Sequence, residues 1–177
     1  GLIESDPSDW VRALAIYPRN ELLKDQVSET LTQTRRIRSI LRNSGRRALT
    51  IGTLFGPTPK TARDAGEKWR KHGGEPCVCP FLVCPDCGSS LVWREDDREV
   101  DRERLECQKC ECTVESEEVI LTRNRIQNEP PDILFTTTEM MNQRMTDSRM
   151  WKLFGVGTSP HKKPAFLLLD EAHTYDG

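Results

Sequence analysis

The sequence predicts an α/β fold in which a parallel sheet is flanked by helices and interrupted by a small cysteine-rich module. Apolar runs at residues 11–17, 48–55 and 132–135 are each followed by a helical pattern, which is the order of βα units. Residues 166–169 form an unbroken apolar run, typical of a central strand that is buried on both faces of the sheet. All seven cysteines lie within residues 72–122, which indicates a separate metal-binding segment.

The net charge of the 177 residues is only −2, but the charges are unevenly distributed. Residues 1–70 hold five more basic than acidic side chains, residues 71–122 hold seven more acidic than basic ones, and residues 123–177 are balanced. No apolar run approaches the length of a membrane span, and the first residues lack a signal-peptide pattern. We therefore expect a cytoplasmic protein without a membrane partner.

The first βα unit begins with a buried strand at residues 11–17, which Pro18 ends. Asn20 is the expected N-cap of the long helix that follows, and Gly45 is its expected C-terminal stop. The residues that recur every three to four positions on one face of this helix are Leu23, Val27, Leu31, Thr34, Ile37 and Leu41.

Basic residues are concentrated at the end of this helix and in the turn after it. Cations are favourable near a helix C-terminus, so a solvated helix face explains part of the pattern. A path for nucleic acid is the alternative, although no aromatic residues are interleaved to stack on bases. The residues concerned are Arg35, Arg36, Arg38, Arg42, Arg46 and Arg47.

The second unit consists of a strand at residues 48–55 and a short helix at residues 61–69. The connecting stretch ends in Lys60-Thr61, as a phosphate-binding P-loop does. A P-loop requires glycine before the lysine, whereas Pro59 here lacks an N–H group. We therefore exclude a P-loop at this position.

The cysteine segment contains two C-x₂-C turns, Cys84–Cys87 and Cys107–Cys110, separated by 19 residues. This spacing is typical of a site where four thiolates bind one structural Zn²⁺ in tetrahedral geometry. Residues 91–93 and 104–106 are expected to pair as a hairpin between the two turns, which is the plan of a zinc ribbon.

Three cysteines remain outside these turns. Cys112 is an alternative to Cys110, and Cys77 with Cys79 could contribute to a second site, but three thiols do not complete another set of four. We expect one zinc ion, no disulfides, and no open catalytic position. Because the segment is acidic, it repels phosphate, so a structural role or contact with a protein partner is favoured over nucleic-acid binding.

A strand beginning at residues 132–135 ends in three threonines, of which Thr138 is the expected N-cap of the next helix. The hydroxyls of these threonines can alternatively donate to a phosphate. Methionines 140, 141 and 145 are expected in the core. Residues 147–154 are predicted to form a short amphipathic helix, and residues 155–163 a loop before the last strand.

Asp170 and Glu171 directly follow the apolar run at residues 166–169. Carboxylates at the carboxyl end of such a strand lie at the edge where open α/β sheets bind ligands. In a nucleotide site, one of them can hold Mg²⁺ while the other positions or deprotonates water. An acidic turn after a buried strand is the alternative interpretation.

Three stretches, in this order, resemble motifs of superfamily 2 DEAD/DEAH-box helicases. Tyr17-Pro-Arg-Asn-Glu-Leu-Leu-Lys-Asp-Gln26 resembles motif Ia, Thr136–Met141 resembles motif Ic, and Asp170-Glu-Ala-His173 resembles the DEAH box. The resemblance covers residues 11–56 and 130–177. The forms of the first and last stretches look most like the large bacterial helicases of genome-defence systems, which would imply a role in antiviral defence.

The resemblance implies a partial RecA-like motor domain, formed by residues 1–71 and 123–177, with the Cys₄ zinc ribbon of residues 72–122 inserted into it. It implies that Asp170 holds the Mg²⁺ of bound ATP, that Glu171 is the general base, and that His173 couples the nucleotide to the nucleic-acid cleft. The residues that would contact the phosphates of the nucleic acid, with DNA the expected polymer, are Arg19, Asn20, Thr137 and Thr138.

The chain departs from the helicase pattern because it contains no Walker A loop and no second RecA-like domain. We therefore expect a piece of a longer motor that does not hydrolyse ATP by itself. Two alternatives remain from the sequence: a non-catalytic zinc-ribbon interaction module on an α/β scaffold, and a translocase that moves on a duplex without separating its strands.

Overall fold

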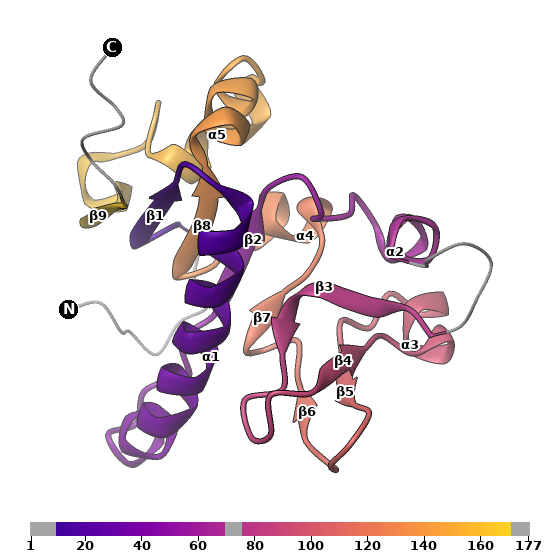
Figure 1. Ribbon diagram of the computed structural model, residues 1–177. Coiled ribbons are helices and arrows are strands. Elements are labelled where there is room, and N and C mark those ends of the chain that lie inside the picture. Colours follow the sequence, from indigo (N-terminus) through magenta and orange to yellow (C-terminus); the bar gives the residue numbers. More distant parts are fainter. Residues whose placement is uncertain (1–9, 70–75, 171–177) are drawn as a thin grey trace.

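Five parallel strands form the main sheet of the computed structural model, which describes residues 10–69 and 76–170 (Figure 1). In spatial order they are β7 (Val119–Ile120), β2 (Ile51–Leu54), β8 (Ile133–Thr137), β1 (Ala13–Tyr17) and β9 (Phe166–Leu169). Every neighbouring pair is parallel. The predicted α/β class with a helix-flanked parallel sheet is confirmed.

Helices cover both faces of this sheet, as parallel strands require. Alternate residues of β1 show the division: Ala15 and Tyr17 pack with the long helix α1 (Asn20–Asn43). Leu14 and Ile16 face the opposite layer. That second layer is built mainly from α4 (Arg123–Asn128), α5 (Thr138–Met145) and the 3₁₀ helix η1 (Ser148–Phe154).

The N-cap of helix α1 lies one residue before the expected Asn20. Arg19 is the N-cap, with an extended backbone (φ −130°, ψ 143°), and its carbonyl accepts a hydrogen bond from the Leu23 N–H at 3.3 Å. Asn20 is therefore the first helical residue. Gly45 ends the helix as expected, in the left-handed region at φ +68°. Ile37 was expected on the packed face but is 38% exposed.

The connection after β2 forms the short helix α2 (Ala62–Lys68) at the predicted place. Thr61 caps it by accepting a hydrogen bond from the Asp64 N–H, and the Asp64 carboxylate accepts in return from the Thr61 N–H. This reciprocal capping box explains why the helix begins at Ala62.

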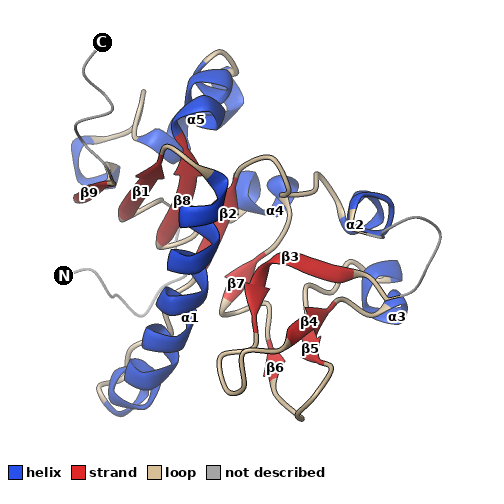
Figure 2. Ribbon diagram, in the orientation of Figure 1, coloured by secondary structure: helices blue, strands red, loops and turns tan. Residues whose placement is uncertain are grey.

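The cysteine segment folds as a four-stranded antiparallel sheet (Figure 2). Its strands are β3 (Val78–Val83), β4 (Ser90–Val92), β5 (Leu105–Cys107) and β6 (Thr113–Val114), with helix α3 (Glu95–Glu99) between β4 and β5. The predicted hairpin is confirmed, because Val92 pairs with Glu106 and Leu91 with Cys107. Strand β7 follows within the same cysteine-rich range of the sequence, yet it pairs with β2 in the parallel sheet.

Aromatic side chains connect the two sheets. Phe55, after β2, makes an edge-to-face contact with Phe81 of β3, with ring centroids 5.4 Å apart. Phe81 contacts Trp69 at 5.5 Å, and Trp69 contacts Trp93 at 5.7 Å. Phe55, Phe81 and Trp93 are at most 2% exposed. The cysteine segment and the parallel sheet therefore share one continuous apolar core.

Thr137, rather than the expected Thr138, caps α5. Its hydroxyl accepts the Met140 N–H at 3.2 Å, while Thr138 is the first residue of the helix. Met140 is buried and Met141 packs against the core as predicted. Met145 was expected there too, but it is 38% exposed because it lies in the last turn of the short helix.

Strand β9 differs most from its prediction. It lies at the edge of the sheet, where it pairs with β1 only, and all four of its residues are between 46% and 59% exposed. The prediction of a central, buried strand is therefore wrong for the described residues. The apolar run at 166–169 is compatible with burial on both faces, but no described element covers either face.

Candidate metal centre and carboxyl edge of the sheet

Four cysteine sulfurs converge at the tip of the antiparallel sheet. The Sγ atoms of Cys84, Cys87, Cys107 and Cys110 all lie within 4.8 Å of one another. Cys84–Cys110 and Cys87–Cys110 are 3.6 Å apart, and Cys87–Cys107 is 3.5 Å apart. Tetrahedral Zn–S bonds of about 2.3 Å require sulfurs roughly 3.8 Å apart, so the donor set fits one Zn²⁺ closely.

Each pair of sulfurs is presented by a tight backbone turn. In the first turn the Gly88 N–H donates to the Cys84 carbonyl at 2.8 Å, and Gly88 adopts φ +70°, where a side chain is strained. In the second, the N–H groups of Lys109 and Cys110 donate to Cys107 Sγ at 3.3 and 3.4 Å. The C-x₂-C spacing thus sets both the position and the hydrogen bonding of the sulfurs.

Hydrogen bonds at two of the four sulfurs, Cys87 and Cys107, favour the thiolate, which is the form that binds metal. At Cys110 a backbone hydrogen bond acts to lower the pKa, but the neighbouring sulfurs, Cys107 first, and burial raise it to about 12 instead. Hydrogen bonds from the hydroxyl and the N–H of Ser89 lower the pKa of Cys87 to about 6. The N–H of Lys109 is the main cause that lowers the pKa of Cys107. Zn²⁺ would complete a closed four-sulfur site with no position left for substrate, which is a structural site.

The other three cysteines lie outside this cluster. Cys112 Sγ accepts a hydrogen bond from Arg35 at 3.1 Å, and Cys77 Sγ donates to the Ala65 carbonyl at 3.5 Å. Cys79 is buried, and burial raises the pKa of its thiol to about 12. Of the alternatives that the sequence left open, the structure therefore favours Cys110 over Cys112 and one four-cysteine cluster within the described residues.

The sheet brings together the predicted site residues that are described. Tyr17 and Thr137 end neighbouring strands and pair in register, so Arg19, Asn20 and Thr138 follow at the same carboxyl edge. Arg19 and Asn20 are exposed there. The hydroxyl of Thr137 is buried and engaged in capping α5, which limits its access to a ligand.

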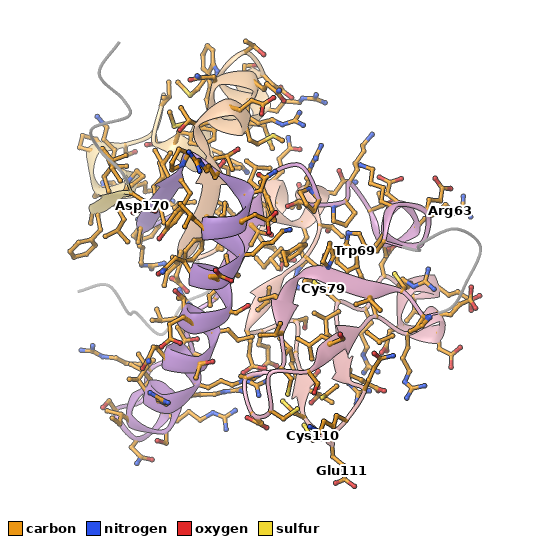
Figure 3. The ribbon with its side chains drawn as sticks, in the orientation of Figure 1. Arg63, Trp69, Cys79, Cys110, Glu111 and Asp170 are labelled. Atoms are coloured by element: carbon orange, nitrogen blue, oxygen red, sulfur yellow. The ribbon has the colours of Figure 1, made fainter. Side chains whose placement is uncertain are left out.

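Asp170 lies at this edge as well, directly after β9. Its N–H donates to the Ile16 carbonyl at 3.2 Å, which fixes it beside the end of β1. Burial, followed by the charge of Asp170, raises the pKa of Tyr17. Glu171 and His173 lie outside the described residues. Figure 3 shows Asp170 at the left and Cys110 at the bottom of the view, well apart, so the metal centre and this edge are separate sites.

Two of the buried carboxylates, Asp132 and Glu103, hold networks that the sequence did not indicate. Asp132 accepts from Arg12 at 2.6 Å, from Arg47 at 2.5 and 2.7 Å, and from the Thr50 N–H at 2.9 Å. It joins the amino ends of β1, β2 and β8. Glu103 accepts from the N–H groups of Leu121 and Thr122, the Thr122 hydroxyl and Arg125. Their partners are distant in sequence, so local patterns gave no signal.

Searches for similar proteins found nothing: no family model, no curated protein and no solved structure matches this chain. Within the part of the chain that the structure describes, no helix is long and apolar enough to cross a membrane.

Proposed function

We propose that this chain is part of a superfamily 2 nucleic-acid motor that couples hydrolysis of Mg²⁺-bound ATP to unwinding of, or translocation on, DNA. The observation that carries the proposal is the adjacency of β9, β1 and β8 in one parallel sheet. The three motif-like stretches follow these strands in the sequence, and their described residues, up to Asp170, lie at a single carboxyl edge. Ligands of open α/β sheets bind at such an edge.

The nucleotide end of the proposed site would be formed by Asp170, together with Glu171 and His173, which follow it in the sequence. Asp170 would hold Mg²⁺, and that ion would compensate the negative charge of the ATP phosphates. Glu171 would accept the proton of the attacking water, and His173 would link the nucleotide to the nucleic acid. The position of Asp170 beside the end of β1 supports its role, since it lies next to the motif Ia-like turn.

The nucleic-acid end would be formed by Arg19 and Asn20, with Thr138 on the neighbouring strand-to-helix turn. Arg19 and Asn20 are exposed at the first turn of α1, where backbone N–H groups of a helix start are available to a phosphate. Thr137 would contribute mainly by holding α5 in place, because its hydroxyl already accepts the Met140 N–H.

The test uses the complete protein that contains this chain. Glu171→Gln is expected to abolish DNA-stimulated ATP hydrolysis while ATP binding persists, because the base is lost but the Mg²⁺ ligand remains. Arg19→Gln is expected to weaken DNA binding with ATP binding unchanged. ATP turnover by Glu171→Gln at the wild-type rate would refute the catalytic role. The 177-residue chain alone is expected to show no turnover.

A second candidate function is a non-catalytic zinc module that contacts another protein. The four-sulfur cluster favours it, together with the acidic composition of the cysteine segment. In that case Glu171→Gln in the complete protein would change no activity, whereas loss of the metal would remove partner binding.

A further inference from the structure

A pocket of about 770 Å³ lies at the amino-terminal edge of the parallel sheet, away from the edge that holds Asp170. Its walls come from the C-terminal end of α1, the approach to β2, strand β7 and the end of α4. This volume is in the range of sites for small organic ligands. Figure 1 shows α1 running from the carboxyl edge of the sheet toward this opposite side.

Five arginines line the pocket, and carboxylates hold three of them in place. The anchored pairs are Arg38 with Glu117 and Glu118, Arg47 with Asp132, and Arg125 with Glu103 and Glu129. Arg42 and Arg46 are exposed, and no described residue accepts a hydrogen bond from either guanidinium or forms an ion pair with it. These two arginines therefore provide the surplus positive charge of the pocket.

Capping of α1 does not account for Arg42 and Arg46. The carbonyls of Ile40, Leu41 and Arg42 are already satisfied by the backbone N–H groups of residues 44, 45 and 46, at 2.9 to 3.2 Å. The turn around Gly45 makes these bonds without any guanidinium. Both side chains thus remain available to an anion.

The pocket also has an apolar part, formed by Ala48, Ile120 and Pro130. Ile120 and Pro130 are buried, so this surface is held in place by the sheet behind it. Apolar groups beside guanidinium groups suit a flat ring, because arginine stacks on planar rings while it donates to a phosphate.

We infer that this pocket binds a small ligand that combines one planar ring with one phosphate group, as in a nucleoside monophosphate, where a ribose links the two. Arg42 and Arg46 would donate to the phosphate, and the ring would lie against Ala48 and Pro130. Two unpaired arginines match the charge of about −2 on a phosphate monoester at neutral pH. The inference is independent of the motor proposal, whose nucleotide would lie at the other edge of the sheet.

A continuous nucleic-acid strand fits this pocket less well. Glu117 and Glu129 also line it, and their side chains are 74% and 63% exposed. Carboxylates in these positions repel a phosphate backbone that extends beyond the pocket. A short ligand with one phosphate avoids them.

Isothermal titration of the 177-residue chain with AMP tests the inference, with adenosine, inorganic phosphate and a single-stranded oligonucleotide as comparison ligands. AMP is expected to bind more tightly than either adenosine or phosphate alone. The double variant Arg42→Gln/Arg46→Gln is expected to weaken AMP binding by about tenfold or more. Arg36→Gln, an exposed arginine of the same helix outside the pocket, is the matched control and should leave binding unchanged.

Four outcomes would overturn the inference. They are no AMP binding at millimolar concentration, equal binding of AMP and phosphate, equal effects of Arg36→Gln and the double variant, and tighter, arginine-dependent binding of the oligonucleotide. Because all three substituted arginines are exposed, circular dichroism and thermal unfolding should match the wild type, which excludes misfolding as the cause.

Discussion

Arg35 of α1 and Glu118, just before β7, form a two-point ion pair. Arg35 Nε donates to Oε1 at 2.9 Å and Nη2 donates to Oε2 at 2.8 Å. The same guanidinium donates to Cys112 Sγ and to the carbonyl of Thr113. One side chain of the long helix therefore fixes the chain that follows the second metal-binding turn, and this link joins the cysteine segment to the parallel sheet.

Arg35→Ala is expected to lower the free energy of unfolding by about 2 kcal/mol, because the largely buried Glu118 carboxylate loses its closest partner. Urea denaturation with zinc present measures this change. Arg36→Ala removes an exposed arginine at the next position and should cost less than about 0.5 kcal/mol. Equal effects of the two substitutions would contradict the proposed link.

Substitution of single cysteines should distinguish the four metal ligands from the nearby Cys112, which is not a ligand. Cys84→Ser and Cys107→Ser are each expected to abolish stoichiometric zinc binding, because three sulfurs do not close the site. Cys112→Ser is the control and should retain one zinc per chain. Elemental analysis of purified protein measures the stoichiometry, and zinc loss in Cys112→Ser would mean that the cluster is incorrectly assigned.

The ion pairs of Asp132 with Arg12 and Arg47 should make the free energy of unfolding fall in acid. Burial acts to raise the pKa of Asp132, but hydrogen bonds from Arg47 and Thr50 and the nearby charges outweigh it and lower the pKa below 3.8. Since the folded pKa is below the unfolded one, the carboxylate stabilises the fold above its ordinary pKa, and this contribution is lost as the pH falls through the folded value.

Asp132→Asn is accordingly expected to cost about 3 kcal/mol at pH 7, since it removes the buried carboxylate charge that pairs with Arg12 and Arg47. The difference in unfolding free energy between variant and wild type should shrink between about pH 5 and pH 2. Chemical denaturation across this range measures it. A constant difference at every pH would show that the carboxylate charge is not the cause.

Phe81 should contribute more to the free energy of unfolding than a residue that packs only within the cysteine segment, because its ring contacts both Phe55 and Trp69. Phe81→Ala is expected to lower the unfolding free energy by about 3–5 kcal/mol. Phe81→Leu should cost clearly less, since it keeps most of the apolar volume. If the cysteine segment unfolded separately from the sheet in Phe81→Ala, two transitions would replace one.

The exposed strand β9 should promote self-association of the 177-residue chain. Its apolar side chains and its unpaired edge are both available within the described structure. Leu167→Lys/Leu168→Glu is expected to shift the chain toward monomer in sedimentation velocity at matched concentration. Val100→Lys changes an exposed apolar residue elsewhere and should have no such effect. A wild-type chain that stays monomeric at high concentration would contradict this prediction.

The features that the sequence predicted well depend on local spacing. The βα unit from β1 to α1 and the two C-x₂-C turns follow from residues close together in the chain, and both are in place. The helix caps at Asn20 and Thr138 were each displaced by one residue, because a cap depends on the backbone angles of the residue before the helix.

Features that depend on distant contacts were not predictable. The ion pair between Arg47 and Asp132 joins residues 85 positions apart. The two residues of β7 carry no pattern that would place them beside β2 rather than in the cysteine segment. Apolarity shows that β9 tolerates burial, but whether anything covers the strand depends on other parts of the fold.

The contact between Trp69 and Trp93 provides an intrinsic spectroscopic probe of the cysteine segment. The two indoles have ring centroids 5.7 Å apart and are inclined at 48°, so we expect them to contribute to the near-ultraviolet circular dichroism of the folded chain. Trp93 directly follows strand β4, which pairs with the strand that carries Cys107. Chelation of the ion should therefore be visible as a change in this aromatic band, without any added dye or label.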